Sequence, residues 1–274
     1  MTLQEIQTLS LRMMEDIHAF CVSNGIRYSL AYGSLIGAVR HHGFIPWDDD
    51  IDIMMSRPDF ETFSRDYKSH NGFVLSSVYS TNTYMNYTRV YDSSTIVISP
   101  AVPSKHEVGV WIDVYPIDGI PDNDAARNDQ FQRLRKYTSL IIRWRRALYK
   151  IRHGSFFQRI RSCVVLLSLR FLNRWESYQI WHDKVISICR ENTFGETKRC
   201  SSLVCFDANK KNRQEVFLTS DFDRYELIQF EDHHFYIVSE YDHVLRTVFG
   251  DYMQLPPKEE RISHVIHNWG FYWK

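Results

Sequence analysis

The chain is poor in cysteine, glycine and proline, and it has no excess of either charge. Its 274 residues include five cysteines, 11 glycines and 8 prolines. An odd, small number of irregularly spaced cysteines is typical of a reducing compartment and predicts a cytoplasmic protein rather than a disulfide-stapled one. Lys+Arg and Asp+Glu number 33 each, so net charge does not indicate a nucleic-acid partner.

Long hydrophobic runs are also missing. The longest runs from Cys163 to Leu169 and ends at Arg170, which is far too short to span a bilayer. The first residues show no basic stretch followed by an apolar core, so no signal peptide is expected. The whole chain contains 44% hydrophobic and 24% charged residues. This composition is typical of a globular protein, and the chain is large enough to bury a core.

The hydrophobic pattern predicts an α+β fold with a mixed sheet. In residues 1–121, helical spacing runs from Leu3 to Cys21 and stops at Asn24-Gly25. Further helices are expected to follow Gly33 and Ser56. Strands are expected at 26–32 and 50–55, and β-rich stretches at 73–79, 88–99 and 108–117. Residues 122–200 read as basic helices with a break near 153–155, and 201–274 as a segment that packs on the core and completes the site.

Four aspartates occupy five positions at 48–52. On a strand, Asp50 and Asp52 would point to one face with Cα atoms roughly 6.5–7 Å apart, and Asp48 would extend that face. Like charges this close need compensation, which a divalent cation with oxygen ligands supplies. A calcium loop of the EF-hand type is disfavoured, because its required glycine and terminal glutamate are absent.

Two further features complete a metal-assisted phosphoryl-transfer pattern. Gly33-Ser34 forms a turn before a short helix, where phosphate can approach the backbone. Asp113 lies inside an apolar stretch that predicts a strand, and it is the expected third carboxylate of the metal site. A buried aspartate is costly without a partner, so Asp113 is expected to have one in the fold. Asp118 is the weaker candidate, because it follows Pro116 near an expected turn.

The stretch from Tyr32 to Met54, which reads YGSLIGAVRHHGFIPWDDDIDIM, closely resembles the LicD family of phosphotransferases. WIDVYPID at 111–118 resembles that family's second acidic strand. A third match lies in 241–261, from Tyr241-Asp242 through Phe249-Gly250-Asp251 and Leu255-Pro256-Pro257 to Arg261. The three matches keep their order across nearly the whole chain.

The resemblance implies a nucleotidyltransferase-like fold, shared distantly with fukutin-related protein, and a metal-assisted reaction. A phospho-alcohol, with phosphocholine favoured, would move from a CDP-activated donor to a sugar hydroxyl of a cell-surface glycan or its lipid-linked precursor. Asp50, Asp52 and Asp113 match the catalytic acids and, with Asp48, would hold Mg²⁺ or Mn²⁺. Gly33 and Ser34 match the phosphate turn.

Other residues are candidates for substrate contact. Arg40 and His41 would add positive charge near the phosphates, and Arg261 belongs to the third match. Trp47 is expected either to line the substrate pocket or to pack in the core. His264 and His267 are expected either to orient substrate or to have a structural role. A choline cation would need an aromatic cage, for which the chain offers Tyr79, Tyr84, Tyr87, Tyr91, Trp111 and Tyr115.

Residues 130–175 contain twelve Lys or Arg and no Asp or Glu. Basic residues beside Ile141, Ile142, Trp144 and Leu148 are typical of an interfacial helix, which predicts peripheral contact with an anionic membrane such as the inner face of the plasma membrane. A solvated basic face or an acidic glycan partner is the alternative; no motif indicates nucleic acid.

Two other functions stay open. A nucleotidyltransferase that moves NMP onto a small molecule would use the same three acids and would release pyrophosphate instead of CMP. An inactive glycan-binding or scaffold protein belongs to another class, and it would have no use for three carboxylates suited to a metal.

Overall fold

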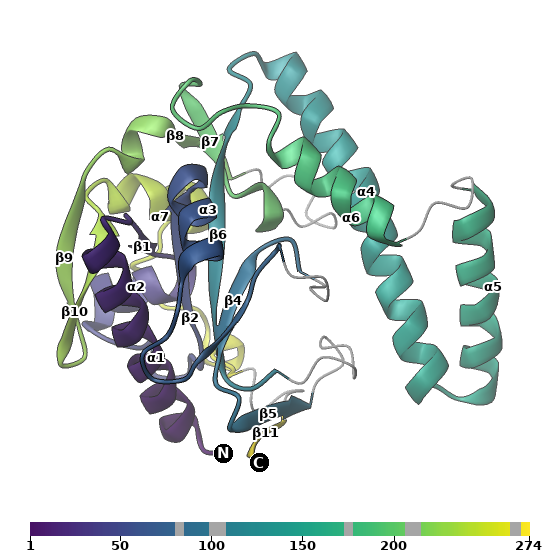
Figure 1. Ribbon diagram of the computed structural model, residues 1–274, viewed down its shortest axis with the longest axis horizontal. Coiled ribbons are helices and arrows are strands. Elements are labelled where there is room, and N and C mark those ends of the chain that lie inside the picture. The colour runs from purple at the N-terminus through teal and green to yellow at the C-terminus, as the bar shows by residue number, and fades with distance from the viewer. Residues whose placement is uncertain (80–84, 99–107, 173–177, 206–214, 264–269) are drawn as a thin grey trace.

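A computed structural model describes residues 1–79, 85–98, 108–172, 178–205, 215–263 and 270–274. It confirms the α+β class. A curled mixed sheet with the strand order β1-β2-β6-β4-β3 forms the centre, and β7 and β8 extend it from the far end of the long strand β6. Helices α1, α2 and α3 lie around this sheet, and α4, α5 and α6 extend away from it (Figure 1).

The helices and strands have the following bounds. The helices are α1 Leu3–Asn24, α2 Tyr32–His41, α3 Arg57–Asp66, α4 Asp124–His153, α5 Phe156–Leu172, α6 Tyr178–Cys189 and α7 Tyr241–Phe249. The strands are β1 Ser29–Leu30, β2 Ile51–Ser56, β3 Val74–Ser76, β4 Thr88–Tyr91, β5 Thr95–Ile98, β6 Trp111–Ile120, β7 Arg199–Ser201, β8 Phe217–Leu218, β9 Tyr225–Phe230, β10 His233–Val238 and β11 Gly270–Trp273.

The helix ends follow from local chemistry. At the start of α1, the Thr2 hydroxyl accepts from the Glu5 N–H, and the Glu5 carboxylate accepts from the Thr2 N–H, which is a capping box. Gly25 ends the helix at φ 64°, in the left-handed region that glycine tolerates. Ser56 caps α3, and Pro58 lies in its first turn. These helices and the helical region with its break at 153–155 confirm the sequence prediction.

Two strand predictions need correction. The strand expected at 26–32 is only Ser29–Leu30, because Tyr32 already begins α2. The strand expected from Asp50 begins at Ile51, so Asp50 precedes it. The β-rich stretch 88–99 forms two strands, because the Asp92 carboxylate accepts from the Ser94 N–H and hydroxyl and closes a turn between them.

The buried side chains form two separate hydrophobic cores. The larger one surrounds the sheet and takes residues from 6–117 and from 200–271, so the C-terminal segment packs on the sheet. The N-terminal amine also donates to the Phe271 carbonyl at 2.7 Å, which places the two chain ends together (Figure 1). The smaller core lies among α4, α5 and α6, around Phe131, Leu134 and Trp181. None of the helices in the described ranges is long and apolar enough to cross a membrane.

Candidate active site

Two acidic residues lie side by side on neighbouring parallel strands. β2 pairs with β6 in parallel, and the register places Asp52 directly opposite Asp113. Neighbouring strands in a sheet are about 4.8 Å apart, so the two aspartates lie side by side in the sheet. The apolar neighbours Ile51, Ile53 and Ile112 are fully buried and fix both strands in the core. The sheet therefore joins acids that lie 61 positions apart in the chain.

The loop before β2 adds three more carboxylates. Asp48, Asp49 and Asp50 each offer an oxygen, and these oxygens lie within 4.8 Å of one another. Asp49 is buried and accepts from the Ser263 hydroxyl at 2.9 Å, and the Asp48 carbonyl accepts from the Gln7 side chain at 2.8 Å. The loop is thus held between α1 and the C-terminal segment, with its carboxylates gathered.

Four of these acids, Asp48, Asp50, Asp52 and Asp113, interact electrostatically. The pKa of Asp52 is raised well above its ordinary value, first because the carboxylate is removed from water and then because Asp50, Asp113 and Asp48 repel its charge. Arg89 opposes this effect but does not cancel it. When no cation is bound, the surroundings of Asp52 therefore destabilise its ionised form.

Asp113 is held in place by an arginine and two tyrosines. Arg89 on β4 donates to both Asp113 oxygens, at 2.6 and 2.9 Å. The Tyr87 and Tyr115 hydroxyls lie 3.4 and 3.3 Å from Asp113 Oδ2. The Arg89 guanidinium also stacks 4.0 Å from the centre of the Trp111 ring. Asp113 therefore has the ionic partner that a buried acid was expected to need.

Gly33 and Ser34 lie in the first turn of α2 rather than in a turn before it. The Ser34 hydroxyl is buried and accepts from the Asp52 N–H at 2.9 Å. Gly33 is pressed against the acidic loop, because a Cβ at this position would lie 2.6 Å from Asp48 Oδ2. Both residues therefore position the acids. Ser34 fixes the backbone of Asp52, and glycine at position 33 leaves room for the Asp48 carboxylate.

The donor set fits a hard divalent cation. Every gathered ligand is a carboxylate oxygen, the class that Mg²⁺ and Mn²⁺ prefer. The acids outnumber Arg89, which offsets part of the charge at Asp52, and a bound cation would relieve the repulsion that raises the pKa of Asp52. Asp48, Asp49, Asp50 and Asp52 are the residues that fit such an ion, with Asp113 beside them.

A group of basic side chains lies next to the acidic loop. The Arg261 guanidinium lies 5.4 Å from the centre of the Trp47 ring, and Arg40 donates to His41 Nε2 at 3.0 Å. Burial lowers the pKa of Arg40, and the nearby charge of Arg261 lowers it further. Burial also lowers the pKa of His41, and the charge of Arg40 adds to this effect. The structure thus gathers Arg40, His41, Trp47 and Arg261, and it packs Trp47 partly buried against the core.

Only some of the tyrosines considered for a cage come together. The rings of Tyr87 and Tyr115 are 4.7 Å apart between centres, and Tyr32 lies 5.6 Å from Tyr115. The Tyr32 hydroxyl donates to Glu215 at 3.1 Å. Tyr79 lies elsewhere, under Arg190, and Trp111 stacks with Arg89. Tyr84, His264 and His267 lie outside the described residues.

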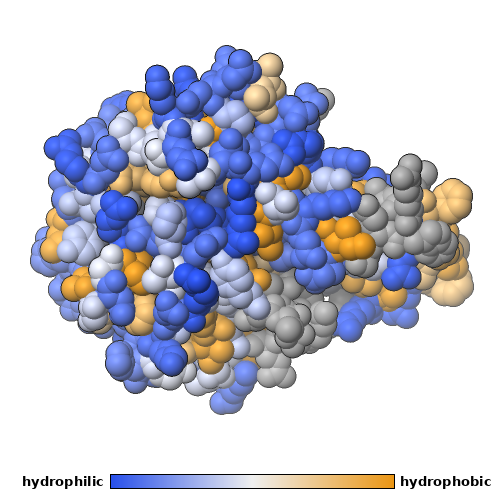
Figure 2. Space-filling model, turned by 45° about the horizontal axis from the view of Figure 1, so that its top comes forward, coloured by the Kyte–Doolittle hydropathy of each residue, from blue (hydrophilic) through white to orange (hydrophobic). Residues whose placement is uncertain are grey.

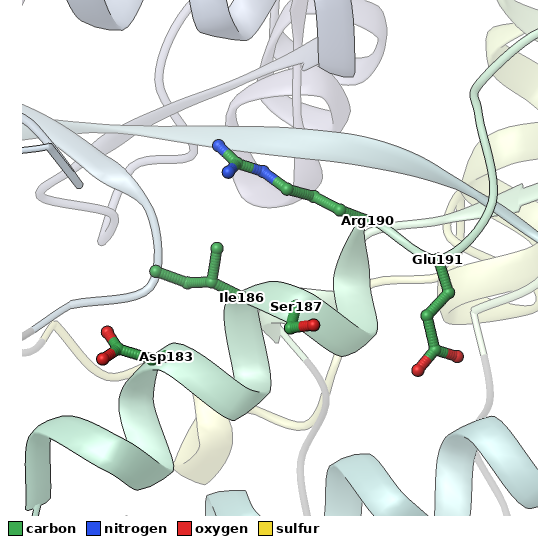
Figure 3. Close-up of a pocket in the computed structure, with 5 residues that line it drawn as sticks. All are labelled: Asp183, Ile186, Ser187, Arg190 and Glu191. Carbon is green, nitrogen blue, oxygen red and sulfur yellow. The ribbon is translucent and has the colours of Figure 1, made fainter.

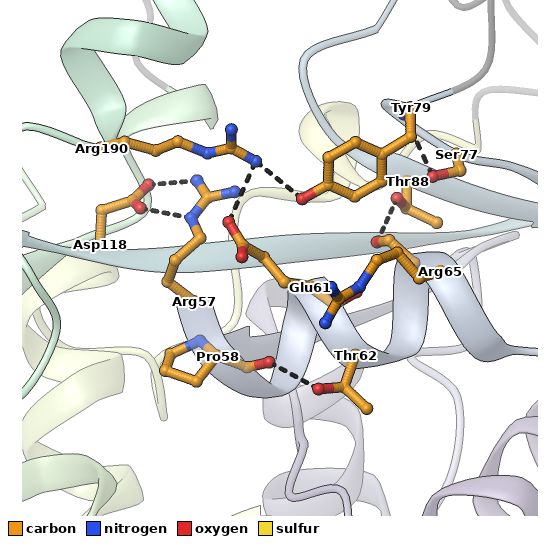
Figure 4. A network of polar contacts seen from close by, with 11 residues as sticks. Arg57, Pro58, Glu61, Thr62, Arg65, Ser77, Tyr79, Thr88, Asp118 and Arg190 are labelled. Carbon is orange, nitrogen blue, oxygen red and sulfur yellow. Dashed lines mark hydrogen bonds and ion pairs between the residues drawn. The ribbon is translucent and has the colours of Figure 1, made fainter.

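Asp118 has a structural role in the sheet. It lies within β6, not in a turn, and is almost fully buried. Arg57 at the start of α3 donates to both of its oxygens, at 2.6 and 2.7 Å (Figure 4). Beside this pair, Arg190 bonds Glu61 at 3.0 Å and the Tyr79 hydroxyl at 2.7 Å. The network joins α3, β6 and the end of α6, and it is separate from the gathered acids.

A surface depression of about 480 Å³ lies over α6 and the residues after it. It is lined by Asp183, Ile186, Ser187, Arg190 and Glu191 (Figure 3). Arg133 binds Glu191, and Arg190 binds Glu61, so the charges around it are paired. None of the gathered acids lines this depression.

Sequence reasoning missed four residues of the site. Asp49 was passed over because alternation on a strand favoured Asp48, Asp50 and Asp52, whereas 48–50 form a loop. Arg89 and Ser263 contact the acids only through tertiary folding, and no local signal marks them. Tyr32 directly precedes Gly33-Ser34, and that adjacency was a usable signal.

Known proteins are similar to this chain in sequence. Residues 25–155 match the family model described as LicD/FKTN/FKRP, nucleotidyltransferase domain. Over 277 residues the chain is 26% identical to the lipopolysaccharide cholinephosphotransferase LicD of Haemophilus influenzae, covering 97% of each protein. A stretch of 58 residues is 45% identical to an uncharacterized protein of Rickettsia typhi, covering 21% of this chain and 19% of that protein. The family match contains the whole acidic loop, Asp52 and Asp113, and the chain therefore carries a nucleotidyltransferase domain of the LicD family.

Proposed function

We propose that the protein is a metal-dependent phosphotransferase that moves phosphocholine from CDP-choline to a sugar hydroxyl of lipopolysaccharide or its lipid-linked precursor. The observation that carries this proposal is the pairing of Asp52 with Asp113 beside the loop of Asp48, Asp49 and Asp50. The similarity to a lipopolysaccharide cholinephosphotransferase over 97% of the chain supports the choice of alcohol and acceptor.

The acids bind the cation that the chemistry requires. Asp50 and Asp52, with Asp48 and Asp49, hold Mg²⁺ or Mn²⁺, which neutralises charge on the donor diphosphate when bound. Ser34 keeps the backbone of Asp52 in register, and Gly33 leaves room for Asp48. Arg89 fixes both oxygens of Asp113, which either completes the cation site or accepts the proton of the acceptor hydroxyl.

The bond changes balance as an in-line displacement. The acceptor oxygen forms a bond to the phosphorus that carries choline, and the bond from that phosphorus to the bridging oxygen breaks. CMP leaves with the bonding electrons, and the hydroxyl proton passes to a carboxylate of the site. Arg40 and Arg261 lie where positive charge can bind donor phosphates, next to Trp47.

Tyr87 and Tyr115 lie against Asp113, and Tyr32 lies against Tyr115, so we assign the choline group to this side of the site. A quaternary ammonium binds the faces of aromatic rings. Glu215, bonded to Tyr32, adds a negative charge of the right sign. We place the reaction in the cytoplasm, consistent with the free thiols of Cys21, Cys163, Cys189 and Cys200.

The test offers CDP-choline, CDP-ribitol and CDP-glycerol to the protein with Mg²⁺ and with EDTA. We expect Mg²⁺-dependent thermal stabilisation by CDP-choline and release of CMP, both lost in the Asp50→Asn/Asp52→Asn variant. An Asp183→Asn variant on α6 is the matched control, since it removes an aspartate away from the gathered acids.

Two outcomes would contradict the proposal. Stabilisation by nucleoside triphosphates with release of pyrophosphate, and none by any CDP-alcohol, would assign a nucleotidyltransferase. Full biological activity of the Asp50→Asn/Asp52→Asn variant would assign a binding or scaffold role.

A further inference from the structure

Helix α5 carries a continuous apolar stripe on the face that it turns to solvent. Phe157 is 81% exposed, Phe171 73% and Phe156 71%. At 3.6 residues per turn, all the large exposed apolar residues of the helix fall within a stripe about 100° wide: Phe156, Phe157, Ile160, Val164, Leu167 and Phe171. The opposite side, with Ser162 and Leu169, is buried.

Positive charge borders this stripe on both sides. On the same helical projection, Arg159 and Arg170 lie along one margin and Arg161 along the other, and all three are exposed. The second half of α4, which packs against α5, adds four exposed cations: Arg143, Arg146, Lys150 and Arg152. The chain has no Asp or Glu from 131 to 175, so no acid within this segment offsets the charge.

The position of α5 leaves the stripe accessible. The helix lies at the end of the molecule farthest from α1 and α2, at the right of Figure 1. Figure 2 shows hydrophobic side chains next to hydrophilic ones at that end. Since no described helix can span a bilayer, the stripe is suited to lying along a surface rather than crossing a membrane.

The arginines beside the apolar stripe indicate which kind of partner can cover it. In a symmetric dimer the same patch of each subunit meets itself, so the arginine margins of two copies would face each other and repel. An anionic lipid surface instead offers phosphates to the margins and an apolar layer to the phenylalanines, the arrangement of an interfacial amphipathic helix.

We infer that α5, with the second half of α4, docks the protein on an anionic lipid surface. The phenylalanines of the stripe enter the boundary between head groups and acyl chains, and the arginines bind lipid phosphates. This inference goes beyond the proposed reaction and does not depend on it. If the acceptor is lipid-linked, docking would bring the acidic site to the surface where the acceptor lies.

The test is co-sedimentation of the full chain with vesicles of phosphatidylcholine alone and of phosphatidylcholine with phosphatidylglycerol. We expect binding to the anionic vesicles only, weakened by salt. Phe156→Ser/Phe157→Ser/Phe171→Ser should lower the affinity at least about tenfold. The matched control replaces three other exposed apolar residues, which lie outside the basic segment, Val22→Ser/Ile98→Ser/Leu227→Ser, and should bind like the parent protein.

A second variant keeps the inference testable if the serine variant folds poorly. Arg159→Gln/Arg161→Gln retains the stripe and should bind anionic vesicles more weakly, with a smaller dependence on salt. Equal binding to both vesicle types, or binding unchanged in both variants, would overturn the inference. So would a concentration-dependent dimer, measured by light scattering, that the serine variant abolishes while vesicle binding persists.

Discussion

In the β-sheet, Arg89, Asp113 and Asp118 are buried in ion pairs, whereas the charged side chains of α5 and of the second half of α4 are of one sign and mostly exposed. Arg89 binds Asp113, and Arg57 binds Asp118, each through two hydrogen bonds. Apolar residues differ in the same way, since Phe63 in the core is fully buried and Phe157 on α5 is 81% exposed. The sheet thus fixes the positions of its charges, whereas α5 and the second half of α4 leave theirs exposed to solvent.

The largest expected effect contrasts one phenylalanine in each region. Phe63→Ala should lower the free energy of unfolding by about 3–5 kcal/mol, because the ring packs against Phe20 and Tyr67 and leaves a cavity. Phe157→Ala should change it by less than about 0.5 kcal/mol. Urea unfolding of both variants measures the difference; a large cost at Phe157 would mean that α5 is covered by the protein itself.

The buried ion pair behind the site should be nearly as costly to break. Arg57→Met leaves Asp118 buried without its partner, which should cost about 3–5 kcal/mol. Arg246→Met removes an exposed pair with Asp242 and should leave the unfolding midpoint unchanged. Equal effects in urea unfolding would show that burial does not set the value of these pairs.

Asp52→Asn should raise stability while it abolishes function. Folding raises the pKa of Asp52, so the folded protein binds more protons than the unfolded chain between the ordinary value of 3.8 and the raised one. In EDTA, stability should therefore fall as pH rises through that window in the parent protein, and much less in Asp52→Asn.

CMP release by the same variant should drop at least about a hundredfold, because a cation ligand is lost. Thermal unfolding across pH, with and without Mg²⁺, measures the first effect. A parent protein that grows more stable as pH rises through this window would contradict the electrostatic picture of the acids.

Gly33→Ala should have the smallest of these effects. The new methyl group would press on Asp48 Oδ2, the end of a side chain that can shift at small cost, and should weaken thermal stabilisation by Mg²⁺. In an Asp48→Ala background the same substitution should cost less, because the clash is gone. A double-mutant cycle measures the coupling, and additive effects would show that Gly33 does not shape the acidic loop.

Much of the fold was predictable where the signal is local. Gly25 and the Ser56 cap with Pro58 mark helix ends in the sequence itself. Strand ends were less predictable: Tyr32 continues an apolar run, yet it begins a helix whose Ser34 bonds the backbone of Asp52, 18 residues away. Contacts between residues that are distant in the chain produce no periodic pattern in the sequence.

The acids of the site were predictable as types but not as a geometry. Alternation identified Asp50 and Asp52, but the loop at 48–50 gathers its carboxylates by turning the chain, which also brings in Asp49. The register that pairs Asp52 with Asp113 and the bond from Arg89 depend on strand pairing across the sheet. The apolar stripe of α5 was readable as a spacing, but whether it faced the core or the solvent required the structure.

The measurement that tests the central claim most directly follows choline labelled in its methyl groups from CDP-choline to lipopolysaccharide, with Mg²⁺ present. We predict one CMP released for each label transferred, and neither product with the Asp50→Asn/Asp52→Asn variant. Transfer of the nucleotide instead of the labelled choline, or transfer that persists in the variant, would contradict the claim that these acids catalyse phosphocholine transfer.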